Sequence, residues 1–218
     1  RMRKILEELG SRDTIAIGGH VRPDGDCVGS CMGMYLYLKK ALPDAQIDVY
    51  LEKPADIFDC IHGIEDVRTD CSKDCVYDVF IVLDTSKERL GDAKKTINVD
   101  HHISNASGCG DVNYCKPDAS SASELVYELL EEKYMDAEIA KALYLGIVHD
   151  TGVFQYSNTT PNTLRIAAKL LAYGFDFSKL IDETFFEKTY VQNQVLGRAL
   201  LESVRFMDGR CIFSSIDL

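Results

Sequence analysis

Short apolar runs separated by polar turns dominate the first hundred residues. Four of these runs have the length and side chains of strands: 14–19, 46–51, 78–83 and 96–99. A helical pattern at 27–40, ended by Pro43, separates the first two runs, and a short helix is expected near 2–9. This alternation predicts a parallel sheet with helices on both faces.

The second half of the chain has the apolar spacing of helices. The expected helices cover 121–133, 136–148, 161–173, 177–185 and 191–207. Thr160 followed by Pro161 is a strong helix start, because a threonine side chain caps free amides and proline fits the first helical position. The tail at 208–218 predicts a turn followed by a strand. The expected fold class is therefore α/β, with a parallel sheet flanked by helices and a mainly helical second half.

A histidine and two aspartates lie between the first strand and the first long helix. His20, Asp24 and Asp26 fall within seven residues, and imidazole and carboxylate are metal-ligand groups. In open α/β sheets, ligands bind at such strand-to-helix turns. Taken alone, the pattern is equally compatible with an acidic loop that caps a helix.

Three further acidic sites end apolar runs. Asp84 closes the run 79–83, Asp100 follows 96–99, and Asp150 follows an apolar segment just before a Thr-Gly turn. A charge at the end of a buried run is costly unless it is paired or bound to a metal. Four such ends predict a carboxylate cage at one edge of the sheet.

Composition limits the classes of function. A net charge of −11 over 218 residues argues against a broad basic surface for long duplex nucleic acid and favours a small substrate. No signal peptide and no run approaching about 18 apolar residues is visible, so we expect a cytoplasmic protein without a membrane role. The eight cysteines form no CxxC pair and are expected to be free thiols. Cys27 and Cys31 would lie one helical turn apart beside the His20 turn, where nothing supports a redox role.

The motifs together carry a resemblance to a known family. They occur in the order His20-x3-Asp24-Gly-Asp26-x2-Gly-Ser, Leu83-Asp84-Thr85-Ser86, Asp100-His101-His102 and Asp150-Thr151-Gly152. This set resembles the DHH phosphoesterases, which are named for the Asp-His-His triplet. The stretches 100–105, 111–114, 119–121 and 150–157 look most like the branch of oligoribonucleases and 3′-phosphoadenosine-5′-phosphate (pAp) phosphatases.

The resemblance implies a domain organisation. It assigns 1–187 to a metal-binding catalytic domain, 188–207 to a connecting helix and 208–218 to the start of a smaller DHH-associated domain. Members of the family usually carry a glycine- and histidine-rich motif in that second domain, and 208–218 contains none. We therefore expect most of the second domain to lie outside this sequence.

The resemblance also implies two divalent cations. An imidazole among carboxylates favours Mn²⁺, with Mg²⁺ or another divalent ion as alternatives. Two such ions about 3.5–4 Å apart clamp the attacking and leaving oxygens of a phosphoryl transfer and activate water, so no protein nucleophile is needed. The implied ligands are His20, Asp24 and Asp84 for the first ion, and Asp26, Asp84, His101 and Asp150 for the second, with Asp84 bridging both.

His102, Arg22 and two serines each allow more than one interpretation. His102 either contacts the phosphoryl oxygen or protonates the leaving alkoxide, or it is a histidine merely hydrogen-bonded outside the metal ligands; Asp100 would orient the imidazoles. Arg22 either meets a substrate phosphate or is a solvated loop residue. Ser120 and Ser121 either donate to phosphate or cap a helix. For His149 we expect packing, and for Lys87 and Arg89 a charged surface turn.

The favoured function is a manganese-dependent phosphoesterase that removes the 3′-phosphate of pAp and trims very short RNA. A pyrophosphatase is disfavoured by the stretches 111–114 and 154–156, whereas a relative that cleaves cyclic dinucleotides or their linear products stays open. A metal-binding or nucleotide-sensing module without catalysis would have lost at least one ligand position, and none is lost here. A homodimer is also left open.

Overall fold

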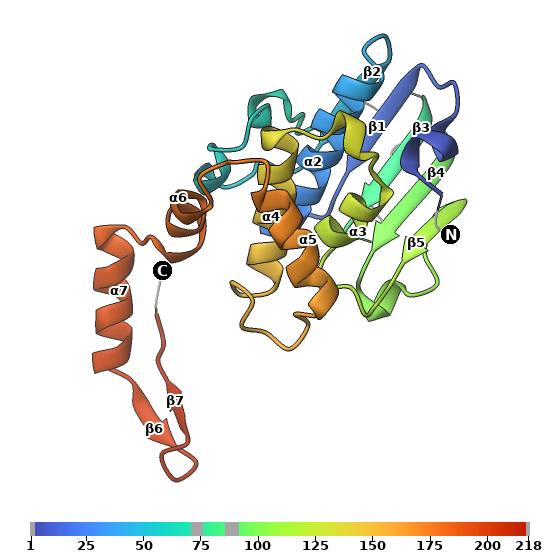
Figure 1. Ribbon diagram of the computed structural model, residues 1–218. Helices are drawn as coiled ribbons and strands as arrows, with labels where there is room; N and C mark the ends of the chain where they lie inside the picture. The colour runs from blue at the N-terminus through green and yellow to red at the C-terminus, as the bar shows by residue number, and fades with distance from the viewer. Residues whose placement is uncertain (1–2, 71–75, 86–91, 217–218) are drawn as a thin grey trace. The chain divides into compact units, whose positions relative to one another are not determined.

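The computed structural model describes residues 3–70, 76–85 and 92–216 (Figure 1). Ser86, Lys87, Arg89, Cys71 and Cys75 lie outside the described residues. The chain forms two compact units, Arg1–Ile181 and Asp182–Leu218, and each is described by itself.

A five-stranded parallel sheet with the order β2-β1-β3-β4-β5 forms the centre of the first unit. Its strands are β1 (Thr14–Gly18), β2 (Gln46–Tyr50), β3 (Tyr77–Leu83), β4 (Ala93–Asp100) and β5 (Val112–Cys115). The predicted parallel sheet is confirmed. The edge strand β5 was not predicted as a strand, because it is short and only partly buried and so lacks an apolar run.

Six α-helices are described in the first unit. They are α1 (Ile5–Leu9), α2 (Gly25–Ala41), α3 (Ala122–Leu129), α4 (Ala137–Asp150), α5 (Pro161–Leu171) and α6 (Phe177–Ile181). As predicted, Thr160 caps α5, and it forms a capping box with Thr163. The helix α4 continues to Asp150, two residues beyond the predicted end. A 3₁₀ turn at Glu132–Tyr134 follows α3 where a longer helix was expected.

The main apolar core lies between the helices and one face of the sheet. Side chains of α1 to α4 pack there against alternate residues of the strands, for example Ile17, Ile81 and Val99. The opposite face carries a smaller cluster of strand residues around Tyr50, Tyr77 and Phe80. Within the described residues the helices therefore pack on one face, and the expectation of helices on both faces is wrong there.

Two glycines allow α2 and α4 to approach closely (Figure 1). A Cβ atom on Gly29 would lie 2.5 Å from the carbonyl oxygen of Ala142 and 2.7 Å from the amide nitrogen of Gly146. A Cβ on Gly146 would overlap Ser123 Oγ and lie 2.7 Å from Asp26 Oδ1. This contact brings the end of α4 to the start of α2.

The second unit contains one helix and one hairpin. Its helix α7 (Tyr190–Leu201) is followed by the antiparallel strands β6 (Val204–Phe206) and β7 (Cys211–Phe213). The predicted strand in the tail is confirmed, whereas the predicted helix 191–207 ends early. Since Val204 and Phe206 favour extended backbone and Met207 to Gly209 have positive φ angles, the chain turns there. Within the described ranges, none of the helices combines the length and the hydropathy that a membrane-spanning helix requires.

Candidate metal centre

The turn between β1 and α2 is organised by Asp24. Its Oδ1 atom accepts hydrogen bonds from the backbone amides of Asp26 and Cys27, both at 3.0 Å, and so caps α2. The Arg22 amide donates to a carboxylate oxygen of Glu52 at 2.5 Å. These bonds place His20 and Asp26 at the carboxyl end of the sheet, while the Arg22 side chain is exposed.

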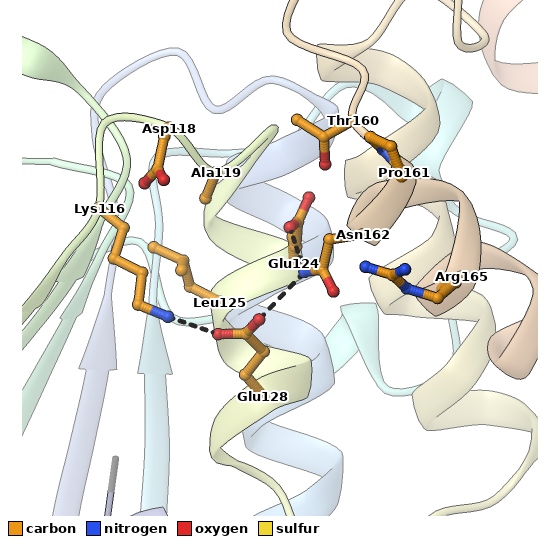
Figure 2. A pocket seen from close by; sticks show the side chains of 10 residues that line it. All are labelled: Lys116, Asp118, Ala119, Glu124, Leu125, Glu128, Thr160, Pro161, Asn162 and Arg165. Atoms are coloured by element: carbon orange, nitrogen blue, oxygen red, sulfur yellow. Dashed lines mark hydrogen bonds and ion pairs between the residues drawn. The ribbon is translucent and has the colours of Figure 1, made fainter. Parts of the chain in front are cut away.

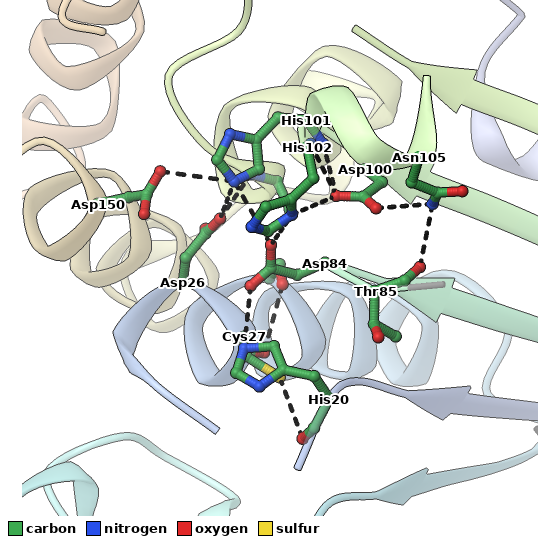
Figure 3. Close-up of polar contacts among 12 residues, drawn as sticks. His20, Asp26, Cys27, Asp84, Thr85, Asp100, His101, His102, Asn105 and Asp150 are labelled. Atoms are coloured by element: carbon green, nitrogen blue, oxygen red, sulfur yellow. Dashed lines mark hydrogen bonds and ion pairs between the residues drawn. The ribbon is translucent and has the colours of Figure 1, made fainter. Parts of the chain in front are cut away.

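Asp84 occupies the middle of the centre (Figure 3). It directly follows β3, is 3% exposed and has a φ angle of 57°, a left-handed conformation that aspartate tolerates better than most residues. Its Oδ2 lies 3.4 Å from His20 Nε2. Its Oδ1 lies 3.5 Å from both His101 Nε2 and His102 Nδ1. The carboxylate therefore faces imidazoles from two different strand ends.

His101 connects Asp84 to two further carboxylates. Its Nε2 atom lies 3.7 Å from Asp26 Oδ2 and 3.5 Å from Asp150 Oδ2. Asp150 comes from the last residue of the helix α4 rather than from the sheet. The expectation that all these side chains leave one edge of the sheet is therefore wrong for Asp150, which reaches the centre because α4 packs closely on α2.

The donor set fits divalent cations. Two atoms that each lie about 2.0–2.2 Å from one ion are roughly 3–4 Å apart, and the separations of 3.4–3.7 Å match this range. Among the described residues, no hydrogen-bond donor meets the buried Oδ1 of Asp84. A buried carboxylate oxygen without a partner is costly, and a cation between Asp84 and the imidazoles would remove that cost.

Three overlapping groups of donor atoms are each contained within 4.8 Å: His20, Cys27 and Asp84; Asp84, His101 and His102; and Asp26, His101 and Asp150. All six predicted ligand positions lie at this centre, with Asp24 Oδ1 3.7 Å from His20 Nε2. Cys27 was not predicted as a donor. Its position directly after Asp26 was the available indication in the sequence. The direction of its side chain, however, depends on where α2 begins.

The electrostatics show an excess of negative charge. Burial, together with the carboxylates of Asp84 and Asp150, raises the pKa of Asp26 well above its ordinary value. Burial raises the pKa of Asp150 to about 6. Burial alone would lower the pKa of His101, but the surrounding carboxylates raise it to about 9. Burial and repulsion among the carboxylates both disfavour the charged forms of Asp26 and Asp150, and bound cations would favour those charged forms.

Asp26 also connects the centre to α3. Its Oδ2 accepts a hydrogen bond from the Ala122 amide at 2.6 Å, and its Oδ1 accepts one from the Ser123 amide at 2.9 Å. The first amides of a helix have no partner within the helix and favour a negative charge. The N-terminus of α3 therefore holds Asp26 in place, a contact between residues far apart in sequence that no local pattern could indicate.

Asp100 holds the His102 ring. The Nδ1–H group of His102 donates to Asp100 Oδ1 at 2.8 Å, and the same oxygen accepts from the backbone amides of His101 and His102. Asn105 donates to Asp100 Oδ2 at 2.7 Å and to the side-chain oxygen of Asn98 at 2.9 Å. Asn98 and Asn105 were not predicted. A polar Asn98 within the apolar run 96–99 was the available signal.

Replacing Asp100 with Asn will lower the pKa of His102 toward its ordinary value of 6.5, because the hydrogen bond from His102 to the Asp100 carboxylate raises that pKa. The contact stabilises the fold fully below pH 6.5 and loses this contribution as the pH rises through the higher folded-state pKa. NMR titration of the metal-free protein measures the shift. His149, which packs against Phe58 as predicted, is the internal control. An unchanged His102 titration would show that Asp100 does not hold the ring.

The predicted substrate residues are placed as follows. Ser121 caps α3 by accepting a hydrogen bond from the Glu124 amide at 3.0 Å, and the Ser120 hydroxyl donates to the Glu124 carboxylate at 2.5 Å. Both serines are buried. The capping interpretation holds for Ser121, whereas Ser120 is held by the Glu124 carboxylate and caps no helix. Contacts of Arg22, Ser120 and Ser121 with substrate stay predictions.

An open cavity of about 360 Å³ adjoins the centre. Its lining includes His20, Asp24, Asp84, Thr85 and His102. The volume is on the scale of small-molecule sites. The cavity therefore gives a small substrate access to Asp84 and His102.

A second cavity, of about 490 Å³, lies between the 116–119 loop, α3 and α5 (Figure 2). Three of its charged side chains, Lys116, Glu124 and Glu128, are engaged in polar contacts. Lys116 pairs with Glu128 at 2.7 Å, and Asn162 donates to both Glu124 and Glu128. This cavity lacks the histidine and aspartate convergence seen around Asp84.

The fold and the site define an α/β protein with a histidine–aspartate centre suited to divalent cations. The chain belongs to the DHH family: the model of the DHH family N-terminal domain matches residues 14–147. The chain is 32% identical to the bifunctional oligoribonuclease and PAP phosphatase NrnA of Bacillus subtilis, over 86% of this chain and 62% of the relative. It is 31% identical to the protein of the same name from Thermus thermophilus, over 85% and 58%. The chain thus spans about three fifths of these curated relatives.

Solved structures share the fold. An exopolyphosphatase-related protein from Bacteroides fragilis superposes with a TM-score of 0.77 at 23% identity, covering 90% of this chain and 63% of that protein. A putative family II inorganic pyrophosphatase from Methanococcus jannaschii gives a TM-score of 0.56 at 17% identity, covering 78% and 59%. At these identities the likeness concerns the fold alone.

Proposed function

We propose that the protein is a phosphoesterase that hydrolyses pAp and short oligoribonucleotides to mononucleotides. The observation that carries the proposal is the convergence of imidazoles and carboxylates from four separate motifs around Asp84 and His101. The names of the relatives from B. subtilis and T. thermophilus support the choice of substrates.

The proposed centre holds two divalent cations, which would polarise the phosphoryl group and activate the attacking water. We assign His20, Asp24 and Asp84 to one ion, and Asp26, Asp84, His101 and Asp150 to the other. Mn²⁺ is the proposed metal because the donors combine imidazole nitrogen with carboxylate oxygen.

His102 is the proposed proton donor. Because its Nδ1–H group is held by Asp100, the Nε2 atom is the one free to face substrate in the cavity that His102 lines. The hydrogen bond to Asp100 raises the pKa of His102, which favours the protonated ring. A protonated Nε2 could bind a phosphoryl oxygen and then donate its proton to the leaving alkoxide.

The substrate is proposed to be small. The net charge of −11 disfavours a long strand, and the cavity beside the centre is of small-molecule size. We also propose a cytoplasmic location and a division into a catalytic domain at 1–187, a connecting helix within 188–207 and the start of a DHH-associated domain at 208–218. A homodimer stays a prediction.

The test is phosphate release from pAp with Mn²⁺. Hydrolysis of a ribodinucleotide, of the linear product of a cyclic dinucleotide and of pyrophosphate is measured in parallel. Turnover of pAp and the ribodinucleotide, abolished by chelation, supports the proposal. Turnover of pyrophosphate alone, or of the cyclic-dinucleotide product alone, would keep the metal centre and overturn the proposed substrates. If none of the four substrates is hydrolysed although metal is bound, the proposed hydrolysis is wrong and a nucleotide-binding module without catalysis is the better interpretation.

A further inference from the structure

One candidate metal ligand at the centre offers sulfur, whereas the others offer nitrogen or oxygen. The Sγ atom of Cys27, a ring nitrogen of His20 and an oxygen of Asp84 lie within 4.8 Å of one another. Figure 3 shows the Cys27 sulfur beside the His20 imidazole and close to Asp84. Cys27 is fully buried in the first turn of α2. Its thiol therefore faces the proposed metal centre from inside the fold.

Two features of the backbone and burial support a donor role for this thiol. A Cβ atom on Gly19 would collide with Cys27 Sγ, so the glycine leaves room for sulfur at this place. Asp84, the neighbouring carboxylate, is only 3% exposed, and its Oδ2 atom lies 3.4 Å from His20 Nε2. The thiol itself contacts the Cys31 side chain and lies 4.0 Å, from Sγ to oxygen, from the His20 carbonyl.

The two halves of the centre offer different chemistry. The group of Asp26, His101 and Asp150 contains only nitrogen and oxygen donors, whereas the group of His20, Cys27 and Asp84 adds sulfur. Thiolate ligands select Zn²⁺, Fe²⁺ and related ions, while carboxylates suit Mn²⁺ and Mg²⁺. A centre with this asymmetry would discriminate between its two ions.

We propose that Cys27 binds, as a thiolate, the ion that His20 and Asp84 hold, so that this position takes a thiophilic divalent ion such as Zn²⁺, Fe²⁺ or Co²⁺. The other position takes Mn²⁺ or Mg²⁺. The inference rests on the proposed two-ion centre and revises its metal at one position. Binding releases the thiol proton of Cys27 to solvent, as metal ligation by cysteine requires.

Cobalt reports directly on the bond. Titration of the metal-free protein with Co²⁺ will produce a near-ultraviolet charge-transfer band from thiolate to cobalt. Cys27→Ala will lose this band, whereas Cys31→Ala, the matched control one turn later on α2 and equally buried, will keep it. The affinity of the first position for Zn²⁺ will fall by at least ~100-fold in Cys27→Ala, beyond the ~10–100-fold typical for loss of an outer-shell partner. Mn²⁺ affinity at the other position will change little.

X-ray absorption of the zinc-loaded wild-type protein gives a test that needs no variant. A sulfur neighbour at about 2.3 Å from zinc supports the inference, and a shell of nitrogen and oxygen alone overturns it. Cobalt binding without the charge-transfer band, or with a band that survives Cys27→Ala, also overturns it and leaves Cys27 as a packing residue. Those results would not affect the proposed hydrolysis, which fails separately if pAp and the ribodinucleotide are not turned over with Mn²⁺.

Discussion

Replacing Asp84 with Asn will reduce hydrolysis of pAp by roughly 10³-fold or more. Asp84 is the carboxylate that faces His20, His101 and His102 together, so its loss would remove the proposed bridge between two cations. Loss of one well-placed electrostatic group at a reacting centre already costs about 10²–10³-fold. Asn is the informative substitution because Asp84 has a φ of 57°, and Asn tolerates that left-handed conformation.

The same variant should gain less stability from metal than the wild type does. The Asp84 carboxylate raises the pKa values of the His20 and His101 imidazoles that it faces, so its charge takes part in the attraction at the centre as well as in the repulsion. Urea unfolding with and without Mn²⁺ measures the difference, because an ion that binds only the folded state stabilises it according to its affinity.

The control is Asp78→Asn, the same chemical change within β3, the strand that Asp84 directly follows. Asp78 pairs with Lys94 near the opposite end of β3, about 20 Å from Asp84 at ~3.3 Å per residue. Hydrolysis should be unchanged in Asp78→Asn. If a folded Asp84→Asn protein hydrolysed pAp at the wild-type rate, the proposal that this carboxylate bridges two ions would be wrong.

Replacing Gly146 with Ala will lower both stability and hydrolysis. The added methyl would overlap Ser123 Oγ and press on Asp26 Oδ1, so α3, α4 or the Asp26 carboxylate must move. Overpacking of this kind costs about 1–3 kcal/mol in the free energy of unfolding. A displacement of ~1 Å at a reacting centre costs about 10²-fold in rate, so we expect a loss of that order.

Gly197→Ala is the matched change without a collision. Gly197 lies within α7, and a Cβ there meets no atom within 4 Å, so the variant should gain up to about 1 kcal/mol from helix propensity. Urea unfolding and initial rates measure both variants. If Gly146→Ala matched the wild type in both, the contact between α4 and Asp26 would not position the centre.

Much of the first unit is predictable because its signals are local. The strands β1 and β3 contain the uninterrupted apolar runs 15–17 and 79–83, and a charge placed directly after such a run indicates a special environment. The edge strand β5 gave no such signal because it is only partly buried and carries Asn113 among its few residues. The strand β6 was assigned to a helix because Val204 and Phe206 continue an apolar pattern.

The candidate metal ligands could be predicted from the sequence, but the contacts that hold them in position could not. His20, Asp84 and His101 stand in recognisable motifs, whereas the amides of Ala122 and Ser123 that hold Asp26 belong to a helix nearly a hundred positions away. Such contacts depend on how helices pack across the sheet, which no single segment determines. The orientation of Cys27 likewise follows from the geometry of the helix start.

Because Asp150 is the last residue of the helix α4, bound cations would connect that helix to the strand ends. His20 and Asp150 are separated by 130 positions, and the unfolded chain would have to close that long loop to bring them together. Ions held at both ends would act as a removable cross-link between the sheet and the end of α4. Chelation would then loosen that helix from the strand ends without breaking any covalent bond.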